Sequence, residues 1–469
     1  MTPAIPAAPE GRLPDGFVVR LDPRVRRRDG GAALLGGSPM RLLRLSPRAR
    51  GLAADGQVVV RDATTATVAA RLLDAGLAHP ELAAARTDDV TVVVPVKDRP
   101  AGLDRLLTAL RADPATADLP VVVVDDGSAE PVTAPGARVL RHDVARGPAA
   151  ARNAGLRAVR TPFVAFLDSD CVPVPGWLQR LRPHLDDPLL AAVAPRIVAE
   201  GGGRSWFAAY EAAVSALDMG SQPAPVRPGS AVSYVPSAAL LARRAALGDG
   251  FDETMQVAED VDLVWRLAAA GWRVRYDPAA EVAHEHPRTT AEWLHRRAFY
   301  GTGAALLAAR HGGAVAPLVI SPETALAWAL ALSGRRWART AAAGVLAVTT
   351  ARLARRLAAP GQRPPAGLAA LLVVRGVGAS GRALARSVTR HYWPLAVPAA
   401  VASRRARRWI LAVALADALG AWWPHRRRVG PVRFAVARRL DDLAYGTGLW
   451  WGAARARDPR ALLPARPQL

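Results

Sequence analysis

Acidic residues follow two short apolar segments of the sequence, where their side chains could bind a cation or a charged ligand. Asp125 and Asp126 end the segment 119–128, and Asp168 and Asp170 end the segment 161–170. Side chains alternate along an extended strand, so Asp168 and Asp170 are expected to project to the same side. Paired carboxylates suit a hard divalent cation, Mg²⁺ or Mn²⁺, which can neutralise a diphosphate leaving group. The alternative is a solvated turn, because many such turns contain Asp-x-Asp.

A third acidic cluster, Glu259, Asp260 and Asp262, opens an expected helix over residues 260–271. Acidic residues in a first helical turn stabilise the helix by a few tenths to ~1 kcal/mol, and this alone would account for them. The functional alternative is a general base, a carboxylate that takes a proton from an acceptor hydroxyl. The cluster by itself does not choose between the two.

The elements that must position these acids alternate between apolar strands and helices. Strands are predicted over 90–96, 119–128 and 161–170, and helices over 103–113 and 147–160. Continuous apolar runs of this kind are typical of strands covered on both faces, as in a parallel sheet. The sequence therefore predicts a doubly wound α/β domain over 89–300. Such domains bind ligands at the carboxyl ends of their strands.

A smaller unit is expected ahead of this domain, over residues 13–85. The pattern predicts a strand over 16–23, a hairpin around Asp29, a short helix over 46–56 and a helix over 63–78 capped by Asp62. This order suggests a winged-helix-like α+β fold. The alternative is a purely structural extension of the next domain.

The third region, 301–469, is rich in alanine, leucine and arginine, and is expected to be helical and embedded in a membrane. Its apolar segments lie at 314–333, 340–354, 366–374, 392–403 and 409–423. The first has twenty residues with one charge, enough to span a bilayer, and arginines flank the last. The alternative is a set of helices buried in a helical appendage.

Composition narrows the class of protein further. The single cysteine, Cys171, excludes an intramolecular disulfide and any multi-cysteine zinc site. A net charge of +22 allows two partners, nucleic acid or an anionic membrane surface. The arginines lie beside apolar segments and no nucleic-acid motif is present, so the membrane is favoured. Residues 1–12 resemble neither a secretory signal nor a membrane span, so the chemistry is expected on the cytosolic side.

Six segments occur in the order and spacing of the family 2 glycosyltransferases with a GT-A fold, and the chain is similar to that family. They are VTVVVPVKDRPAGLDRLLTAL, VVVVDDGS, RGPAAARNAGL, FVAFLDSD, GFDETM and AEDVDLVWRLAAAGWRVRYDP. From about residue 13 to about residue 465 the chain also resembles the mycofactocin-system glycosyltransferases. The segments that carry this wider resemblance include LPDGFVVRLDPRVR, YEAAVSALDMG, VSYVPSAA and RRLDDLAYGTGLWWG.

The resemblance implies a role for individual residues. Pro95, Lys97, Asp125 and Asp126 would surround the nucleotide, and Arg152 and Asn153 would lie beside the sugar or the diphosphate. Asp168 and Asp170 match the Asp-x-Asp motif that holds a divalent metal, with Asp170 the direct ligand. Asp260 matches the catalytic base. A histidine near the metal in related transferases corresponds to His284 or His286.

The resemblance also implies a reaction: inverting transfer of a hexose, glucose from UDP-glucose, to peptide-derived premycofactocin, building a short β-glucan chain. The Gln-x-x-Arg-Trp motif of processive membrane synthases is absent, so long-chain synthesis is not expected. Two alternatives remain. One is a cell-envelope transferase that uses a rhamnosyl or galactofuranosyl donor and a lipid-linked acceptor. The other is a catalytically inactive membrane scaffold that binds a peptide. The leading unit, 13–85, would bind the precursor peptide or a pathway partner protein, or would brace the catalytic domain.

Overall fold

The structure is a computed structural model that describes residues 2–201, 205–358 and 363–467. The chain divides into two compact units. The first, called here the catalytic unit, is Met1–Gly203 with Val214–His286, and the second, the helical unit, is Arg204–Ala213 with Pro287–Leu469. The chain therefore passes between the units three times, because the short segment Arg204–Ala213 interrupts the catalytic unit.

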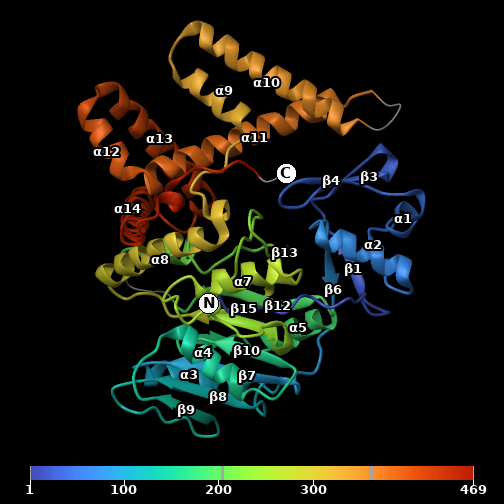
Figure 1. Cartoon of the computed structure of the whole chain (residues 1–469), viewed down its shortest axis with the longest axis vertical. Helices are drawn as coiled ribbons and strands as arrows, with labels where there is room; N and C mark the ends of the chain where they lie inside the picture. Colours follow the sequence, from blue (N-terminus) through green and yellow to red (C-terminus); the bar gives the residue numbers. More distant parts are fainter. Residues whose placement is uncertain (1, 202–204, 359–362, 468–469) are drawn as a thin grey trace. The chain divides into compact units, whose positions relative to one another are not determined.

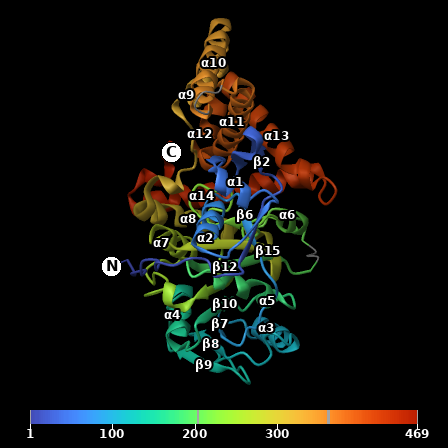
Figure 2. The ribbon, with the colours of Figure 1, turned by 90° about the vertical axis from the view of Figure 1, so that its right-hand side faces the viewer.

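A nine-stranded mixed sheet forms the centre of the catalytic unit. Its strands follow the order β11-β15-β12-β14-β10-β7-β8-β9, with β13 paired to β15 (Figures 1 and 2). Their bounds are β7 (Val90–Val96), β8 (Val121–Asp126), β9 (Arg138–His142), β10 (Phe163–Leu167), β11 (Cys171–Pro173), β12 (Leu190–Ala199), β13 (Ala224–Pro225), β14 (Ala239–Arg243) and β15 (Arg273–His284).

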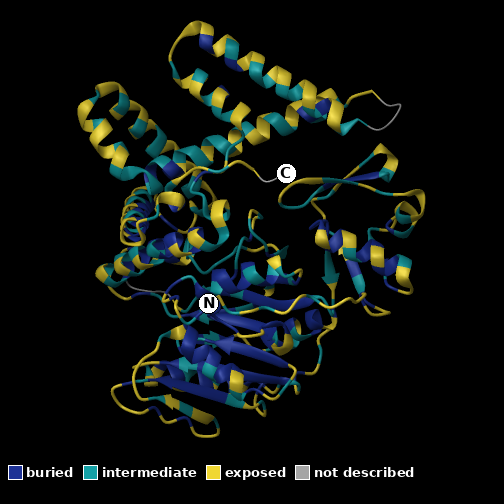
Figure 3. Cartoon of the chain, in the orientation of Figure 1, coloured by how far each residue is buried: buried dark blue, intermediate teal, exposed yellow. Residues whose placement is uncertain are grey.

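The predicted strands and helices of this unit are confirmed, but the sheet is not wholly parallel. Strands β10, β7, β8 and β9 run parallel to one another, whereas β14 runs antiparallel to both of its neighbours, β10 and β12. Valine-rich β7 is buried almost throughout because helices and loops cover both faces of the sheet (Figure 3). The helices that position the site are α3 (Pro100–Ala112), α4 (Pro148–Ala158) and α7 (Glu259–Ala269).

Residues 2–85 fold into two small antiparallel sheets and two α-helices, and belong to the catalytic unit. The elements are β1 (Val18–Leu21), β2 (Arg26–Arg28), β3 (Ala33–Gly36), β4 (Arg41–Arg44), α1 (Pro47–Leu52), β5 (Gln57–Val59), α2 (Ala63–Asp74) and β6 (Ala78–Glu81). Asp62 caps α2 as predicted, because its carboxylate accepts a hydrogen bond from the Thr65 N–H at 2.8 Å. Helix α2 is shorter than expected, since it ends at Asp74 and Gly76 turns the chain with a φ of 66°.

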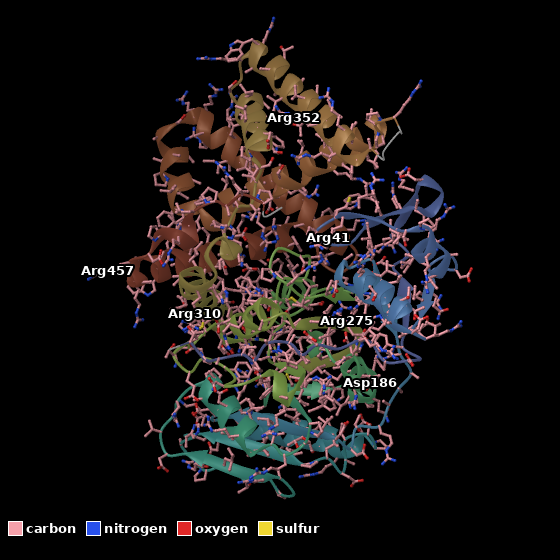
Figure 4. All side chains as sticks on the ribbon, turned by 45° about the vertical axis from the view of Figure 1, so that its right-hand side comes forward. Arg41, Asp186, Arg275, Arg310, Arg352 and Arg457 are labelled. Carbon is pink, nitrogen blue, oxygen red and sulfur yellow. The ribbon has the colours of Figure 1, made fainter. Side chains whose placement is uncertain are left out.

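Contacts join this leading segment to the large sheet. Asp74 receives hydrogen bonds from Arg273 of β15 at 2.7 and 3.0 Å, and Arg275 lies 3.0 Å from the His79 ring. Arg275 is buried inside the catalytic unit, where Figure 4 labels it. These contacts favour a bracing role for the segment, whereas the winged-helix resemblance stays a prediction.

The helical unit contains α6 (Ala208–Ala213) and a series of longer helices. They are α8 (Thr290–His311), α9 (Pro322–Leu332), α10 (Arg336–Leu357), α11 (Ala366–Arg386), α12 (Trp393–Ala402), α13 (Arg404–Trp422) and α14 (Pro431–Ala456). Helices α8 and α14 touch through their backbones: a Cβ added at Gly448 would lie 1.8 Å from the Ala298 carbonyl oxygen. Only glycine permits this approach, which gives a structural reason for the glycines in YGTGLWWG.

Residues 205–213, the described part of the short segment, are fixed to the helical unit by aromatic stacking and a buried ion network. Phe207 stacks on Trp293 with ring centroids 4.8 Å apart, and the Tyr210 hydroxyl donates to Asp441 at 2.9 Å. Glu211 accepts hydrogen bonds from the Trp293 indole at 2.9 Å and from Arg297 at 2.5 Å. All six side chains are buried, so the short segment is part of the core of the helical unit.

The predicted twenty-residue span over 314–333 is wrong as a single helix. Only residues from Pro322 onward form α9, because Ser321 caps the helix and Pro322 occupies its first turn. Within the described residues, one helix is long and apolar enough to cross a membrane, and it runs from Ala366 to His391. Side chains on α9 to α13 are largely exposed or half-buried, and arginines such as Arg352 project from the unit (Figures 3 and 4).

Candidate active site

The Asp-x-Asp segment forms a tight turn at the carboxyl end of β10. The Asp168 N–H donates to the Ala238 carbonyl at 2.9 Å, and the Cys171 N–H donates to the Asp168 carbonyl at 3.0 Å. The start of α3 packs directly on the turn, since a Cβ at Gly102 would lie 2.6 Å from the Ser169 carbonyl oxygen. The turn is thus held from two sides, while the Asp168 and Asp170 side chains keep 29% and 13% of their surface exposed.

Arg152 links this turn to the acidic cluster of α7. From the middle of α4 its guanidinium donates to Asp168 at 2.6 Å and to Glu259 at 2.9 Å. Its charge also lies 5.5 Å from the centre of the Phe251 ring. Burial alone would lower the pKa of Arg152, but the carboxylates of Asp168 and Glu259 outweigh it and raise the pKa above its ordinary value. Arg152 is therefore a permanent buried charge between two acidic motifs.

Asp260 lies in the first turn of α7, where backbone N–H groups point at its carboxylate. The Val261 N–H donates to Oδ1 at 2.8 Å and the Ser237 N–H to Oδ2 at 3.3 Å. Burial and the negative charge of Glu259 raise the pKa of Asp260 to about 7, although Arg152 and these two N–H groups act in the opposite direction. A carboxylate with this pKa can both accept and release a proton near neutral pH.

Residues just before β14 join the two acidic motifs. Ser237 donates to Asp260, and the next residue, Ala238, accepts the hydrogen bond from the Asp168 backbone. The Asp-x-Asp turn and the start of α7 are thus positioned by the same short stretch of chain. In the sequence, VSYVPSAA carries only a family resemblance, and this positioning role is not predicted from it because the contacts are made by backbone atoms.

The two aspartates at the end of β8, Asp125 and Asp126, accept hydrogen bonds from nearby groups of the protein. Asp125 is fully buried and accepts hydrogen bonds from the Ser128 N–H at 3.0 Å, the Val132 N–H at 3.3 Å and the Arg141 guanidinium. Burial would raise the pKa of Asp125, but these hydrogen bonds outweigh it and hold the pKa below its usual value. Asp125 therefore shapes the loop after β8.

Asp126 lies next to this loop and is buried but not fully enclosed. It accepts hydrogen bonds from the Arg146 and Gly147 N–H groups at 2.9 and 2.8 Å and lies 2.7 Å from the His142 ring. Of the β7 residues expected at the nucleotide, Pro95 is half-buried and Lys97, just beyond the strand, is exposed. The structure thus brings Pro95, Lys97 and Asp126 to the same edge of adjacent parallel strands.

Asn153 uses its amide within the protein. The amide donates to the Phe251 carbonyl at 2.8 Å and to Glu253 at 3.1 Å, and its oxygen accepts the Phe251 N–H at 2.9 Å. Both Arg152 and Asn153 are buried, so neither is an ordinary residue on the exposed surface of α4. Asn153 instead fixes the loop that leads toward α7.

His284 faces Asp170 across the strand pair β11 and β15. The His284 Nε2 atom lies 3.4 Å from Asp170 Oδ1, and its buried Nδ1 has no hydrogen-bond partner among the described residues. Two ligands held ~2.1 Å from one divalent ion are roughly 3 Å apart, so this separation fits a shared metal better than a strong hydrogen bond. His286 lies farther along, with its ring centroid 6.5 Å from that of His284.

Another charged side chain, that of Arg99, lies beside Asp170. Arg99 donates to Asp170 Oδ2 at 3.2 Å, and within the described residues no group of three or more His, Cys, Asp or Glu side chains is already gathered as a metal site. The donor set that fits a hard cation is therefore Asp168, Asp170 and His284, with Arg99 as a competing cation. The contacts of Arg99 with Asp170 and of Glu259 with Arg152 are not predicted from the sequence, although both residues lie in segments singled out there.

Comparisons with known proteins agree with this geometry. The family model described as glycosyl transferase family 2 matches residues 91–248, which include β7, the aspartate pair and the Asp-x-Asp turn. The Pre-mycofactocin glycosyltransferase of Mycobacterium tuberculosis is 49% identical over 470 residues, which cover 97% of this chain and 98% of that protein. The chain belongs to the pre-mycofactocin glycosyltransferase family. It is a glycosyltransferase, and its relationship places it in the mycofactocin pathway.

More distant similarities cover less of the chain. The succinoglycan biosynthesis protein ExoO of Rhizobium meliloti is 31% identical over 210 residues, covering 42% of this chain and 60% of that protein. A solved mannosyltransferase from Pyrobaculum calidifontis, in complex with GDP-Man and Mn²⁺, has 21% identity and a TM-score of 0.39, and covers 77% of this chain and 90% of its own.

Proposed function

We propose that this glycosyltransferase moves glucose from UDP-glucose to a hydroxyl of premycofactocin with inversion, and extends it into a short β-glucan. The observation that carries the proposal is that Asp260, a carboxylate with a raised pKa, and the Asp-x-Asp turn are held by the same stretch of chain, Ser237 and Ala238. The buried Arg152 also joins Asp168 to Glu259, the neighbour of Asp260. A general base that takes the proton of an acceptor hydroxyl fits a single in-line displacement, which inverts the anomeric centre. The near full-length similarity supports the acceptor.

In this mechanism each residue has a limited task. Asp260 takes the proton of the acceptor hydroxyl, and Arg152 keeps Asp168 and Glu259 in fixed orientations. Asp168, Asp170 and His284 would hold Mg²⁺ or Mn²⁺, which when bound would offset the charge of the departing diphosphate. Pro95, Lys97 and Asp126 would line the nucleotide position, while Asp125 and Asn153 support the loops around it.

The test is a donor panel with purified protein and premycofactocin. UDP-glucose should give products heavier by one or more hexose units in mass spectra, and NMR should show β-linkages. Faster transfer from a rhamnosyl or galactofuranosyl donor to a lipid-linked acceptor would establish the cell-envelope alternative instead. Failure of the protein to transfer or hydrolyse any nucleotide sugar would support the inactive scaffold.

The Asp170→Asn variant is expected to lose most transfer activity while remaining folded, because a neutral amide is a poor ligand for Mg²⁺ or Mn²⁺. Isothermal titration with MnCl₂ should show weaker binding by the variant than by the parent protein. Asp98→Asn is a matched control, since Asp98 contacts the Ala129 N–H rather than the Asp-x-Asp turn. Unchanged Mn²⁺ affinity and full activity in Asp170→Asn would reduce the motif to a structural turn.

We further propose that residues 13–85 bind the precursor peptide through an open strand edge. Within the described residues, β2 and β4 each pair only with β3, so each leaves one edge available for a peptide to add as a further strand. Hydrogen exchange of the full chain with the peptide should then slow at the amides of β2 or β4. If the peptide changes hydrogen exchange at neither β2 nor β4, the segment does not bind it through these edges. The contacts of Asp74 would then indicate that the segment only braces the catalytic unit.

The proposed partners are therefore a nucleotide-sugar donor, a peptide-derived acceptor and a membrane, with the catalytic unit on the cytoplasmic side. Support for the membrane comes from the apolar helix Ala366–His391 and from the arginine-rich helices that follow it.

A further inference from the structure

Helix α13 carries an apolar stripe on its solvent-facing side. Leu411, Leu415 and Leu419 are spaced four residues apart, and they expose 63%, 61% and 48% of their surface. Residues with this spacing lie on one face of a helix. A helix on the surface of a water-soluble domain normally buries such a stripe, whereas α13 exposes it to solvent.

The one acidic residue of α13 is turned away from this stripe. Asp417 is buried against α14, where Arg438 donates to it at 2.7 and 2.8 Å and Arg439 also contacts it. The buried side of α13 therefore holds an ion cluster, whereas the exposed side between Trp409 and Trp423 is uncharged. This arrangement suits a helix whose outer face contacts a medium less polar than water.

Helix α12 extends the apolar surface. None of its described side chains is buried, and Leu395, Val397 and Val401 expose 58%, 51% and 78% of their surface. Because Ser403 alone separates α12 from α13, the two form one hairpin of helices. The hairpin thus presents two neighbouring apolar helices (Figures 1 and 3).

Arginines lie at both ends of α13. Four occupy its first turns, Arg404, Arg405, Arg407 and Arg408, and three follow its end, Arg426, Arg427 and Arg428. In the described part of the chain, none of the seven has a carboxylate within salt-bridge distance. Only Arg405 and Arg426 donate to backbone carbonyls, those of Ser333 and Trp423. These positive groups complement the phosphates of an anionic lipid surface.

The apolar part of α13 is too short to cross the hydrocarbon core of a bilayer as a straight helix. The stretch from Trp409 to Trp423, whose one charged side chain is the inward-turned Asp417, has fifteen residues, which span ~22 Å at 1.5 Å per residue, whereas a bilayer core is ~30 Å thick. Arginine groups at both ends would also place one group on the non-cytoplasmic side, against the usual distribution of positive charge. A helix lying in the interface meets neither difficulty.

We propose that α12 and α13 form an in-plane anchor that enters one leaflet of an anionic membrane, with both arginine groups at the level of the lipid headgroups. This inference rests on the proposed membrane location but not on the identity of the sugar donor. It assigns the anchoring to a short hairpin that does not cross the bilayer.

Binding to lipid vesicles tests whether the exposed leucines and arginines of α13 contact a membrane. The full chain should float with vesicles of phosphatidylcholine and phosphatidylglycerol, and bind vesicles of phosphatidylcholine alone more weakly. Leu411→Ser/Leu415→Ser/Leu419→Ser should lower the partition coefficient at least tenfold, and Arg404→Gln/Arg407→Gln/Arg408→Gln should remove the preference for phosphatidylglycerol. The matched control is Val139→Ser/Val144→Ser/Val174→Ser, three exposed valines of the catalytic unit, which should bind like the parent.

Labelling of single cysteines tests the in-plane geometry. Because the native Cys171 is buried, an impermeant thiol reagent should modify only an introduced cysteine. In inverted membrane vesicles, Arg404→Cys and Arg428→Cys should both react from the outer, cytoplasmic-derived side. Reaction of one of them only from the lumen would show that α13 spans the bilayer and overturn the inference.

Two further outcomes would also overturn it. If the leucine variant floats like the parent chain, the membrane location stands but another segment provides the anchor. If the parent chain binds no vesicle and sedimentation shows a dimer that the leucine variant dissociates, the stripe joins two copies of the chain. Glucosyl transfer measured on the same preparations reports separately on the proposed reaction.

Discussion

Replacing Asp260 with asparagine should lower kcat by about 10²–10⁴-fold while the affinity for the nucleotide sugar stays within about twofold, because a base acts on the acceptor and not on the donor. In the parent enzyme, kcat/KM should rise with pH through about 7, since the raised pKa of Asp260 keeps the carboxyl protonated below that value. The asparagine variant should lose this rise. Steady-state rates against pH, with donor binding by calorimetry, measure both effects.

The melting temperature of the protein gives an independent check on the raised pKa of Asp260. A carboxyl whose pKa is raised from 3.8 to about 7 on folding stabilises the native state below pH 3.8, and this contribution is lost as pH rises through 7. Asp260→Asn removes the cost of burying the charge, so its melting temperature at pH 8 should equal or exceed that of the parent. Lost donor affinity with normal residual turnover would instead assign Asp260 to the donor site and make another residue the base.

Replacing Arg152 with alanine should destabilise the catalytic unit by about 3–5 kcal/mol and abolish transfer, because it leaves the buried Glu259 and the partly exposed Asp168 without their shared partner. Arg152→Lys should recover little, since one ammonium group cannot reproduce the two-sided contact with Asp168 and Glu259. Urea unfolding and single-turnover rates measure the two effects.

Arg157→Ala provides the control for this prediction. Arg157 belongs to the same helix, but 62% of its side chain is exposed and its closest acidic contact, with Glu253, is 3.8 Å long. Its loss should change stability by no more than about 0.5 kcal/mol. Adding Glu259→Gln to the Arg152 variant should restore part of the stability but not the activity. Full recovery of transfer would show that Arg152 acts only in folding.

The sequence predicts the parallel strands of the catalytic unit well, because short runs rich in β-branched residues, such as Val90–Val96, favour strands over helices. It does not predict that β14 runs antiparallel, since a short apolar run has the same pattern in either direction. The expected span over 314–333 fails for a local reason: apolar composition counts Pro317 and Pro322 as compatible, whereas the backbone begins a new helix at Pro322.

Local sequence patterns also predict only part of the candidate active site. The Asp-x-Asp turn and Asp260 can be proposed from acids that follow strands or open helices, because each is a local pattern. Arg152 and Glu259 are 107 residues apart in sequence, and no local pattern pairs them. Ser237 and Ala238 contribute through backbone atoms, which any residue type supplies. A single sequence therefore indicates the reacting groups better than the groups that hold them in place.

The threefold passage of the chain between its units has a practical consequence for anyone who wishes to separate them. A cut after His286 would leave Phe207, Tyr210 and Glu211 covalently on the catalytic fragment, while their partners Trp293, Arg297 and Asp441 stay on the other. The two pieces should then remain together under native conditions and part only in denaturant, as in split-protein reporters. A helical fragment expressed alone would lack a piece of its own interior, so co-expression of both fragments is the arrangement expected to yield folded material.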